Sequence, residues 1–154
     1  MHTTLTFYSI MKRIITIVVA VLAFAAVAVA QPRALGVRAG YGAELSYQHT
    51  LGGANFGELD LGWGVESFTA ALAYDFVIPT GTPLNFYVGP QVSTYLYNLD
   101  DGLGFGLGAG AQLGLEYMFS FPLQLSLDWR PTFQFIPGTA FGWHSIALGI
   151  RYKF

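Results

Sequence analysis

The sequence predicts an all-β protein, an antiparallel up-and-down transmembrane β-barrel of about eight strands that follows a cleaved N-terminal signal peptide. Between residues 102 and 119 every odd position is apolar, whereas nearly all even positions hold glycine or a polar residue. Successive side chains of a strand leave by opposite faces, so a period of two is typical of a β-strand. Charge is also scarce, because 10% of the 154 residues are charged where a soluble domain carries about 25%.

The N-terminal segment has the order of features expected of a secretory signal peptide. Met11-Lys12-Arg13 is positively charged, residues 14–27 are apolar, and residues 28–30 form a small-residue Ala-Val-Ala cleavage site. The apolar run is short for a membrane-spanning helix, which needs roughly 20 residues. We therefore expect residues 1–30 to be the signal peptide, with 1–10 an upstream extension before the true start at Met11, and 31–154 to be the barrel.

The first strand region, residues 34–48, alternates cleanly but leaves two alternatives open. A hairpin at Gly40-Tyr41-Gly42 would divide it into two short strands, because a three-residue loop keeps the alternation in step and glycine suits a left-handed backbone. This division gives eight strands, and bacterial single-chain barrels have even numbers. One unbroken strand is the alternative.

The remaining strands follow from the same alternation and from the turn residues between them. A turn is expected at 51–55, a proline-rich break at 79–83, a polar loop at 98–102, a tight turn at 120–122 and a loop at 136–142. The strands expected between these breaks cover residues 58–65, 68–78, 84–97, 102–119, 123–135 and 145–154.

Two kinds of closed barrel fit these strands, and the charged residues distinguish them. A soluble lipocalin-like barrel would point its apolar face inward, whereas an outer-membrane barrel points it toward lipid. The polar face is rich in glycine, serine and alanine, as a crowded lumen requires, and the apolar face carries no charge. A Lys or Arg facing mid-bilayer costs about 2–4 kcal/mol, so the membrane barrel is favoured. The charged residues expected to form an ion-pair network in the lumen are Arg38, Glu44, Glu58, Asp60, Asp75, Glu116, Asp128, Arg130 and Arg151.

Aromatic residues cluster toward the strand ends, as expected for the two interfaces of a membrane. Those expected near the periplasmic rim are Phe76, Phe86, Tyr87, Phe119, Phe121, Tyr152 and Phe154. Those expected near the outer rim are Trp63, Phe68, Tyr95, Tyr97, Phe133, Phe135, Phe141 and Trp143.

Motifs that would indicate catalysis or cofactor binding are weak. The glycines of residues 104–110 recur at every second position and do not form a phosphate-binding loop. His144 and Ser145 are adjacent, so in a regular strand they point to opposite faces and cannot act as a dyad. His49 belongs to no cluster with metal-ligand spacing, and there are no cysteines. We expect no catalytic residue, no metal and no cofactor. The net charge of −2 leaves no basic footprint for nucleic acid.

The pattern resembles the small outer-membrane β-barrel family (porin-like, eight-stranded) of Gram-negative bacteria. The resemblance covers residues 31–154 and rests on the signal peptide, the GYGAELSYQH opening, LSLDWRP at 125–131 and the terminal ALGIRYKF. It implies a monomer in the outer membrane that contacts the lipid bilayer. It also implies that Tyr152 and Phe154 belong to the C-terminal signal read by the barrel-assembly machinery.

An eight-stranded barrel has an interior just wide enough for side chains to fill. We therefore expect a structural or interaction role in the outer membrane, with a side-chain-filled polar lumen. The first alternative is a small porin or solute channel, and the second is a lipid-modifying barrel enzyme.

Overall fold

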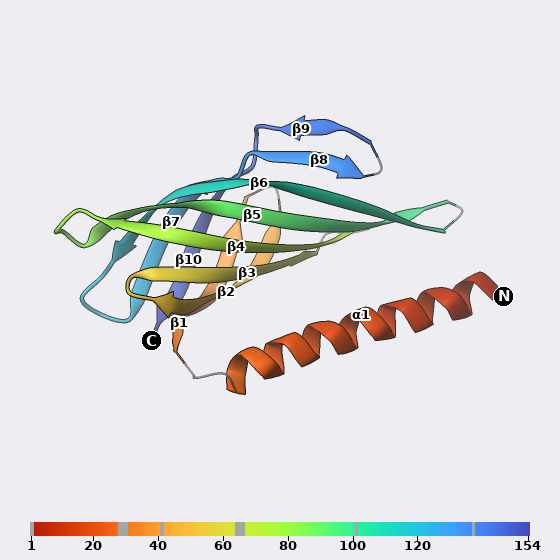
Figure 1. The fold of residues 1–154 in the computed structure, drawn as a ribbon, viewed down its shortest axis with the longest axis horizontal. Coiled ribbons are helices and arrows are strands. Elements are labelled where there is room, and N and C mark those ends of the chain that lie inside the picture. The colour runs from red at the N-terminus through yellow and green to blue at the C-terminus, as the bar shows by residue number, and fades with distance from the viewer. Residues whose placement is uncertain (1, 28–30, 41, 64–66, 101, 137) are drawn as a thin grey trace.

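The computed structural model describes residues 2–27, 31–40, 42–63, 67–100, 102–136 and 138–154. One helix precedes a set of antiparallel strands that close into a barrel (Figure 1). The elements are α1 (His2–Val27), β1 (Pro32–Ala39), β2 (Ala43–Gly52), β3 (Asn55–Trp63), β4 (Ser67–Pro79), β5 (Leu84–Leu99), β6 (Gly102–Met118), β7 (Leu123–Trp129), β8 (Thr132–Ile136), β9 (Ala140–Gly142) and β10 (Ile146–Lys153).

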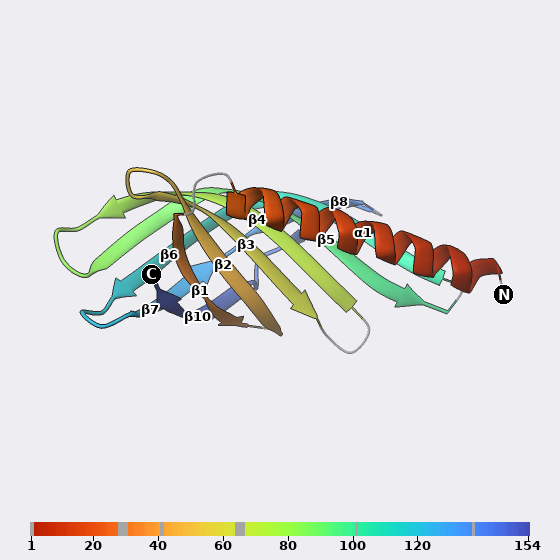
Figure 2. The ribbon, with the colours of Figure 1, turned by 90° about the horizontal axis from the view of Figure 1, so that it is seen from below.

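The strands form a closed eight-stranded barrel. The order around the wall is β5-β4-β3-β2-β1-β10-β7-β6, and the pairing of β5 with β6 closes the ring. β7 and β8 both pair with β6 and together form one of the eight strands of the wall. β9 pairs with β8 and β10 pairs with β7, so β9 and β10 together form the next strand. The two views in Figures 1 and 2 show the strands wrapping around one interior. The predicted all-β fold, an antiparallel barrel of eight strands, is confirmed.

The first strand region is a hairpin, as the first of the two alternatives predicted. β1 and β2 pair from Ala39 opposite Ala43 to Pro32 opposite His49. The N–H of Gly40 donates to the carbonyl of Gly42 at 3.0 Å. Tyr41 lies outside the described residues. These two strands have 8 and 10 residues, whereas β5 and β6 have 16 and 17, so the wall is low on one side and extends on the other into the long β5–β6 hairpin visible in Figure 1.

The predicted strand 123–135 is interrupted at Arg130-Pro131. Proline has no N–H to donate to a ladder, and its carbonyl still accepts the N–H of Ala111 at 3.2 Å. The register along β6 is the same on both sides of the interruption, since Leu113 pairs with Trp129 and Gly110 with Thr132. The expectation that 136–142 is wholly loop was wrong, because Ile136 ends β8 and residues 140–142 form β9; residue 137 is not described.

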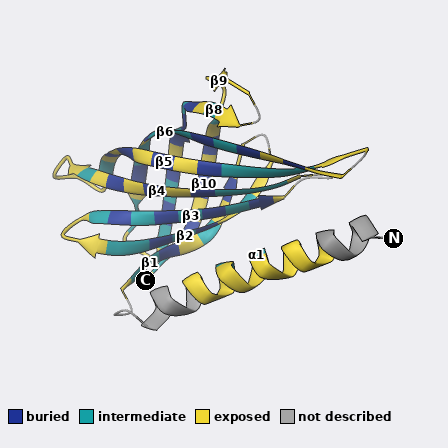
Figure 3. Cartoon of the chain, turned by 45° about the vertical axis from the view of Figure 1, so that its right-hand side comes forward, coloured by how far each residue is buried: buried dark blue, intermediate teal, exposed yellow. Residues whose placement is uncertain are grey.

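Buried and exposed residues alternate along the strands (Figure 3). Most of the buried residues are polar or charged, and the exposed large side chains are apolar or aromatic. The alternation of buried and exposed residues along each strand follows from the period of two in the sequence. A soluble lipocalin-like barrel would show the opposite arrangement. The core of this molecule is therefore made largely of charged and amide side chains.

Helix α1 lies beside the barrel and not within it, as both ribbon views show. Most of its described side chains, those of residues 8–21, are exposed. No helix in the described part of the chain is both long and apolar enough to cross a membrane.

Candidate functional site

The barrel interior gathers all nine charged residues that the sequence analysis assigned to the lumen. Eight are buried, and Glu44 is half-buried, with 23% of its side chain exposed. They come from seven segments of the wall, β1, β2, β3, β4, β6, β10 and the end of β7 with the residue after it. We call the end of the barrel with Phe154 and the turn at residues 80–83 the terminal end, and the opposite end the distal end.

Arg130 is the centre of one group of contacts. Its Nη2 lies 2.6 Å from Asp60 Oδ2 and 3.2 Å from Glu58 Oε1. Its Nε donates to Gln112 Oε1 at 2.9 Å, and its Nη2 donates to the same oxygen. The guanidinium therefore joins β3 to β6 across the interior.

Arg38 forms a second group nearer the distal end. Its Nε donates to Asp128 Oδ2 at 3.0 Å and its Nη2 donates to Asp128 Oδ1, which is the bidentate geometry that favours arginine over lysine. Its Nη1 donates to Glu44 Oε2 at 3.0 Å. One guanidinium thus holds a carboxylate from β7 and another from β2.

Arg151 lies fully buried between β2 and β7. Its Nε donates to Ser46 Oγ at 2.9 Å, and its Nη1 donates to Ser126 Oγ at 2.7 Å and to Gln124 Oε1 at 3.2 Å. Its Nη2 lies 3.5 Å from Glu58 Oε1. Because Glu58 also contacts Arg130, these two arginines share one carboxylate.

Asp75 and Glu116 do not join these groups through an arginine of the predicted set. Asp75 Oδ2 accepts from Gln112 Nε2 at 3.1 Å, and no basic side chain in the described residues forms a salt bridge with it. Glu116 pairs with Arg33 at the terminal end through both oxygens. The network therefore reaches the terminal end through a residue that the sequence analysis missed.

Arg33 was missed because a β-bulge changes the alternation. The register of β1 against β2 shifts between Pro32 and Ala34, which inserts one extra residue. Arg33 thereby lies in the interior although its odd number places it with the apolar face. Its guanidinium carbon lies 4.1 Å from the centre of the Phe56 ring. The proline at the start of the strand was the only local signal of this irregularity.

An aromatic layer lies beside the charges. Phe56 is 0% and Tyr87 1% exposed, and their ring centroids are 5.5 Å apart at 64°. Tyr87 Oη donates to Asp128 Oδ2 at 3.5 Å, a long hydrogen bond. The expectation that Tyr87 belongs to the aromatic residues of the rim was wrong, because the odd positions of β5 face inward and the glycine opposite Tyr87, Gly114, leaves room for its ring.

Outward-facing aromatic residues, exposed or half-buried, contact one another. Trp63 stacks on Phe68, and Trp129 stacks on Trp143, whose carbonyl accepts the Trp129 indole N–H at 2.7 Å. Tyr152 and Phe154, the residues of the expected assembly signal, are both exposed, with ring centroids 5.2 Å apart.

Two adjoining cavities open at the distal end of the interior, and we call them together the distal vestibule. Their volumes are about 240 and 160 Å³, and Glu44, Thr69 and Ser145 line both. Asp60 and Arg130 lie at the wall of the smaller cavity. The vestibule thus has a lining of polar and apolar groups and ends on the charged network.

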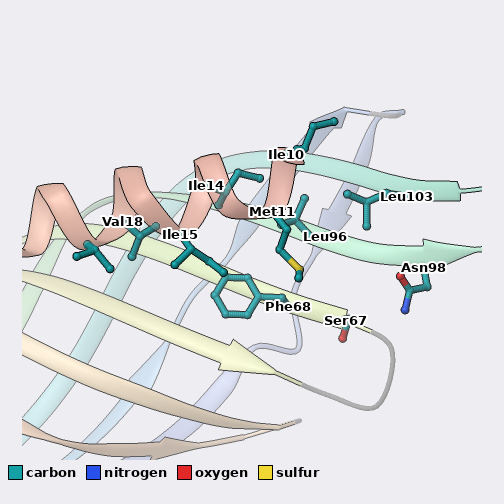
Figure 4. A pocket seen from close by; sticks show the side chains of 11 residues that line it. Ile10, Met11, Ile14, Ile15, Val18, Ser67, Phe68, Leu96, Asn98 and Leu103 are labelled. Atoms are coloured by element: carbon teal, nitrogen blue, oxygen red, sulfur yellow. The ribbon is translucent and has the colours of Figure 1, made fainter. Parts of the chain in front are cut away.

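A different cavity, of about 380 Å³, lies outside the barrel between α1 and the wall (Figure 4). Met11, Ile14 and Ile15 of the helix face Phe68 and Leu96 of the barrel. This cavity is lined mostly by apolar side chains of the helix and of the outer face of the wall.

The histidines form no site with the carboxylates. Tyr47 Oη and His49 Nδ1 are 2.8 Å apart, and His144 is exposed while Ser145 lines the vestibule. In the part of the chain that the structure describes, no group of three or more His, Cys, Asp or Glu side chains could hold a metal ion.

Comparisons with known proteins reach the fold only. No protein-family model matches the chain, and no curated protein matches it. The crystal structure of Neisserial surface protein A is similar, with a TM-score of 0.53, 13% identity and coverage of 80% of this chain and 94% of that chain. At this identity the likeness shows a shared barrel fold and leaves activity open.

Proposed function

We propose that this chain is an integral outer-membrane protein with a structural or interaction role, in which the barrel lumen is filled by side chains and does not conduct. The observation that carries the proposal is the inverted polarity of the barrel, with charged residues inside and leucine, valine and aromatic residues outside. Such an exterior is unstable in water and suits a bilayer, where the strands of a closed barrel satisfy every backbone hydrogen bond.

The route to the membrane follows from the two ends of the chain. Residues 1–30 act as a signal peptide that is removed on export, with Met11 as the start and 1–10 as an extension. Tyr152 and Phe154 act as the C-terminal signal for the barrel-assembly machinery, and their exposed rings at the terminal end support this role. The likeness to a surface protein of Neisseria supports the same location.

The proposal that the lumen is closed rests on three arginines and an aromatic layer. Arg38, Arg130 and Arg151 connect side chains from β2, β3, β6, β7 and β10, and Phe56 and Tyr87 pack beside them. An eight-stranded barrel leaves little space beyond such side chains. We assign no catalytic residue, because His144 and Ser145 do not share a face.

Heat-modifiability and bilayer conductance test the two parts of the proposal separately. Protein extracted from outer-membrane fractions should migrate differently in SDS gels before and after boiling, because a closed barrel resists SDS until it is heated. A soluble periplasmic protein without this shift would contradict the membrane assignment.

The folded protein should then give no conductance steps in a planar bilayer. A double variant, Phe56→Ala with Tyr87→Ala, removes the aromatic layer and serves as the control that the assay detects an opened path. Steps from the unmodified protein would contradict the closed lumen and favour the small channel.

A further inference from the structure

Asp75 is a buried carboxyl group that lacks a cation. Its side chain is 0% exposed, and among the described residues it forms no salt bridge. An ionised carboxylate away from water is costly unless a positive group accompanies it. The other inward-facing carboxylates each form a salt bridge with an arginine; they are Glu44, Glu58, Asp60, Glu116 and Asp128.

The charges of the whole interior show the same imbalance. In the described part of the chain, six carboxylates face inward against five basic groups, which are Arg33, Arg38, Arg130, Arg151 and Lys153. Lys153 lies on the inner face of β10 at the terminal end, where its Nζ donates to the carbonyl of Phe119 at 2.6 Å. The interior therefore holds one carboxyl group more than its basic groups can balance.

The hydrogen bond that Asp75 accepts comes from an amide that it shares with another carboxylate. Asp75 reaches across Gly89 of β5, and its Oδ2 accepts from Gln112 Nε2 of β6 at 3.1 Å. The same Nε2 donates to Glu58 Oε1 at 3.3 Å. Two carboxyl groups thus share one donor nitrogen. When two such groups lie this close, ionisation of both is disfavoured and one of them retains a proton.

The surroundings of Asp75 decide which group holds the proton. The ionisable groups that face it are Glu58 and Asp60 of β3, Tyr87 of β5, Asp128 of β7, and Arg130. Arg130 forms salt bridges with Glu58 and Asp60. On β6, Gln112 is uncharged and Glu116 is paired with Arg33. Every carboxylate around Asp75 is thus held by an arginine, and Asp75 is not.

An unused acceptor lies near Asp75 on the neighbouring strand. Asp75 Oδ1 has no hydrogen-bond partner, and neither has Gln91 Oε1. Gln91 pairs with Ala73, two residues before Asp75, so the two side chains are diagonal neighbours on the inner face. Two acceptors cannot bond to each other, whereas a proton on the carboxyl group makes it a donor.

We propose that Asp75 holds a proton in the folded barrel at neutral pH and makes the packing of the interior dependent on pH. The same carboxyl group is ionised in the unfolded chain above about pH 4. Folding therefore takes up one proton, and a rise in pH favours the unfolded state, which has released it. The inference rests on the barrel interior and is independent of the membrane location.

A bound cation would balance Asp75 less well than a proton. Asp75 lines neither cavity of the distal vestibule, and its unpartnered oxygen is buried. A metal ion would need converging ligands, and the described residues offer no group of three. A proton needs no additional space.

Urea unfolding in lipid vesicles between about pH 5 and pH 7 tests the proposal, with Asp75→Asn as the variant. Asparagine keeps the shape of the side chain and has no carboxylate to protonate. The unfolding constant of the unmodified chain, divided by that of the variant, should rise about tenfold per pH unit, the dependence expected for release of one proton. The other carboxylates titrate in both proteins and cancel in this ratio. A ratio that stays constant would overturn the proposal.

Asp128→Asn is the matched control, because it makes the same exchange at a buried carboxylate that Arg38 holds through both oxygens. Its ratio should stay constant over the same pH range. The same rise for Asp128→Asn as for Asp75→Asn would mean that the missing cation is not the cause, and the proposal would fall.

Infrared spectroscopy of the unmodified barrel keeps the test decisive if a variant fails to fold. In a detergent without carbonyl groups, a protonated carboxyl group gives a C=O band separate from the carboxylate bands. We expect this band at neutral pH and its loss in Asp75→Asn. Its absence from the unmodified protein, or its full retention in the folded variant, would overturn the proposal. Failure of the membrane assignment is read from the SDS gel and stays distinguishable from these results.

Discussion

At the scale of single residues, the interior is fitted by pairing large side chains with glycine. Gly114 on β6 lies directly opposite Tyr87 on β5, and the tyrosine ring lies over it. A Cβ atom at Gly114 would overlap Cζ and Oη of that ring. The ring has no free space to enter, because it is buried against Phe56.

We therefore expect Gly114→Ala to destabilise the barrel by about 1–3 kcal/mol, the usual cost of overpacking a core. Urea unfolding in lipid vesicles, followed by the mobility shift on gels, measures this difference. Gly142→Ala is the matched control, because the nearest atom to its added Cβ is 3.7 Å away, and its effect should stay within about 0.5 kcal/mol. Equal effects of the two substitutions would contradict the packing of Tyr87 on Gly114.

Alternation in the sequence could assign a face to most strand residues but could not show which charges pair. Alternation placed Arg38 and Asp128 on the same inner face, and the structure brings them together although they lie 90 positions apart in the sequence. Which carboxylate meets which arginine depends on the stagger between strands, and no local pattern encodes that stagger. Arg33 was missed for a different reason, because the bulge that turns it inward interrupts the alternation.

At the scale of elements, the turns between strands that are marked by paired glycines or prolines could be predicted from the sequence, whereas the short strand β9 and the interruption at Pro131 could not. Paired glycines around residue 41 indicated the first hairpin, and the prolines at 79 and 83 indicated the β4–β5 turn. By contrast, β9 has three residues, too few for a period of two to be recognised. The interruption at Pro131 was hidden because the alternation continues in register on both sides.

The pairing of the first and last strands is the contact on which closure depends, and it is testable because the chain has no cysteine. Val37 on β1 lies directly opposite Ile150 on β10. Residues opposite each other in an antiparallel pair have Cα atoms about 4.5–5.5 Å apart, within the range for a disulfide. We expect Val37→Cys with Ile150→Cys to cross-link under mild oxidation, seen as a mobility change on non-reducing gels.

Val37→Cys with Ile146→Cys is the control for this cross-link, because Ile146 lies four positions before Ile150 in β10, where it is opposite Trp129 of β7. It should remain reduced under the same conditions. Preferential cross-linking of this control pair would show a different register between β1 and β10, or an open barrel.

At the scale of the whole molecule, the exterior decides which solvent the barrel requires. Leu127, 48% exposed, lies in the middle of β7 between Leu115 of β6 and Leu148 of β10. Leu99, 51% exposed, lies at the distal end of the long β5–β6 hairpin. The two leucines are about equally exposed, but Leu127 lies within the apolar belt, whereas Leu99 lies at the tip of the hairpin on the face of β5 that carries Tyr87. The same substitution at each position therefore reports on the medium around the belt.

In a bilayer, Leu127→Lys should destabilise the folded state by about 2–4 kcal/mol, whereas Leu99→Lys near the interface should cost about 0–1 kcal/mol. In water, both substitutions would be nearly neutral, because a surface change away from packed features usually stays within about 0.5 kcal/mol. Urea unfolding of both variants in lipid vesicles, compared with the unmodified chain, distinguishes these cases. A large cost at Leu127 with a small one at Leu99 would mean that the apolar belt faces lipid. Equal and small costs would mean that water surrounds it, and the inverted polarity would then need a covering partner in place of a membrane.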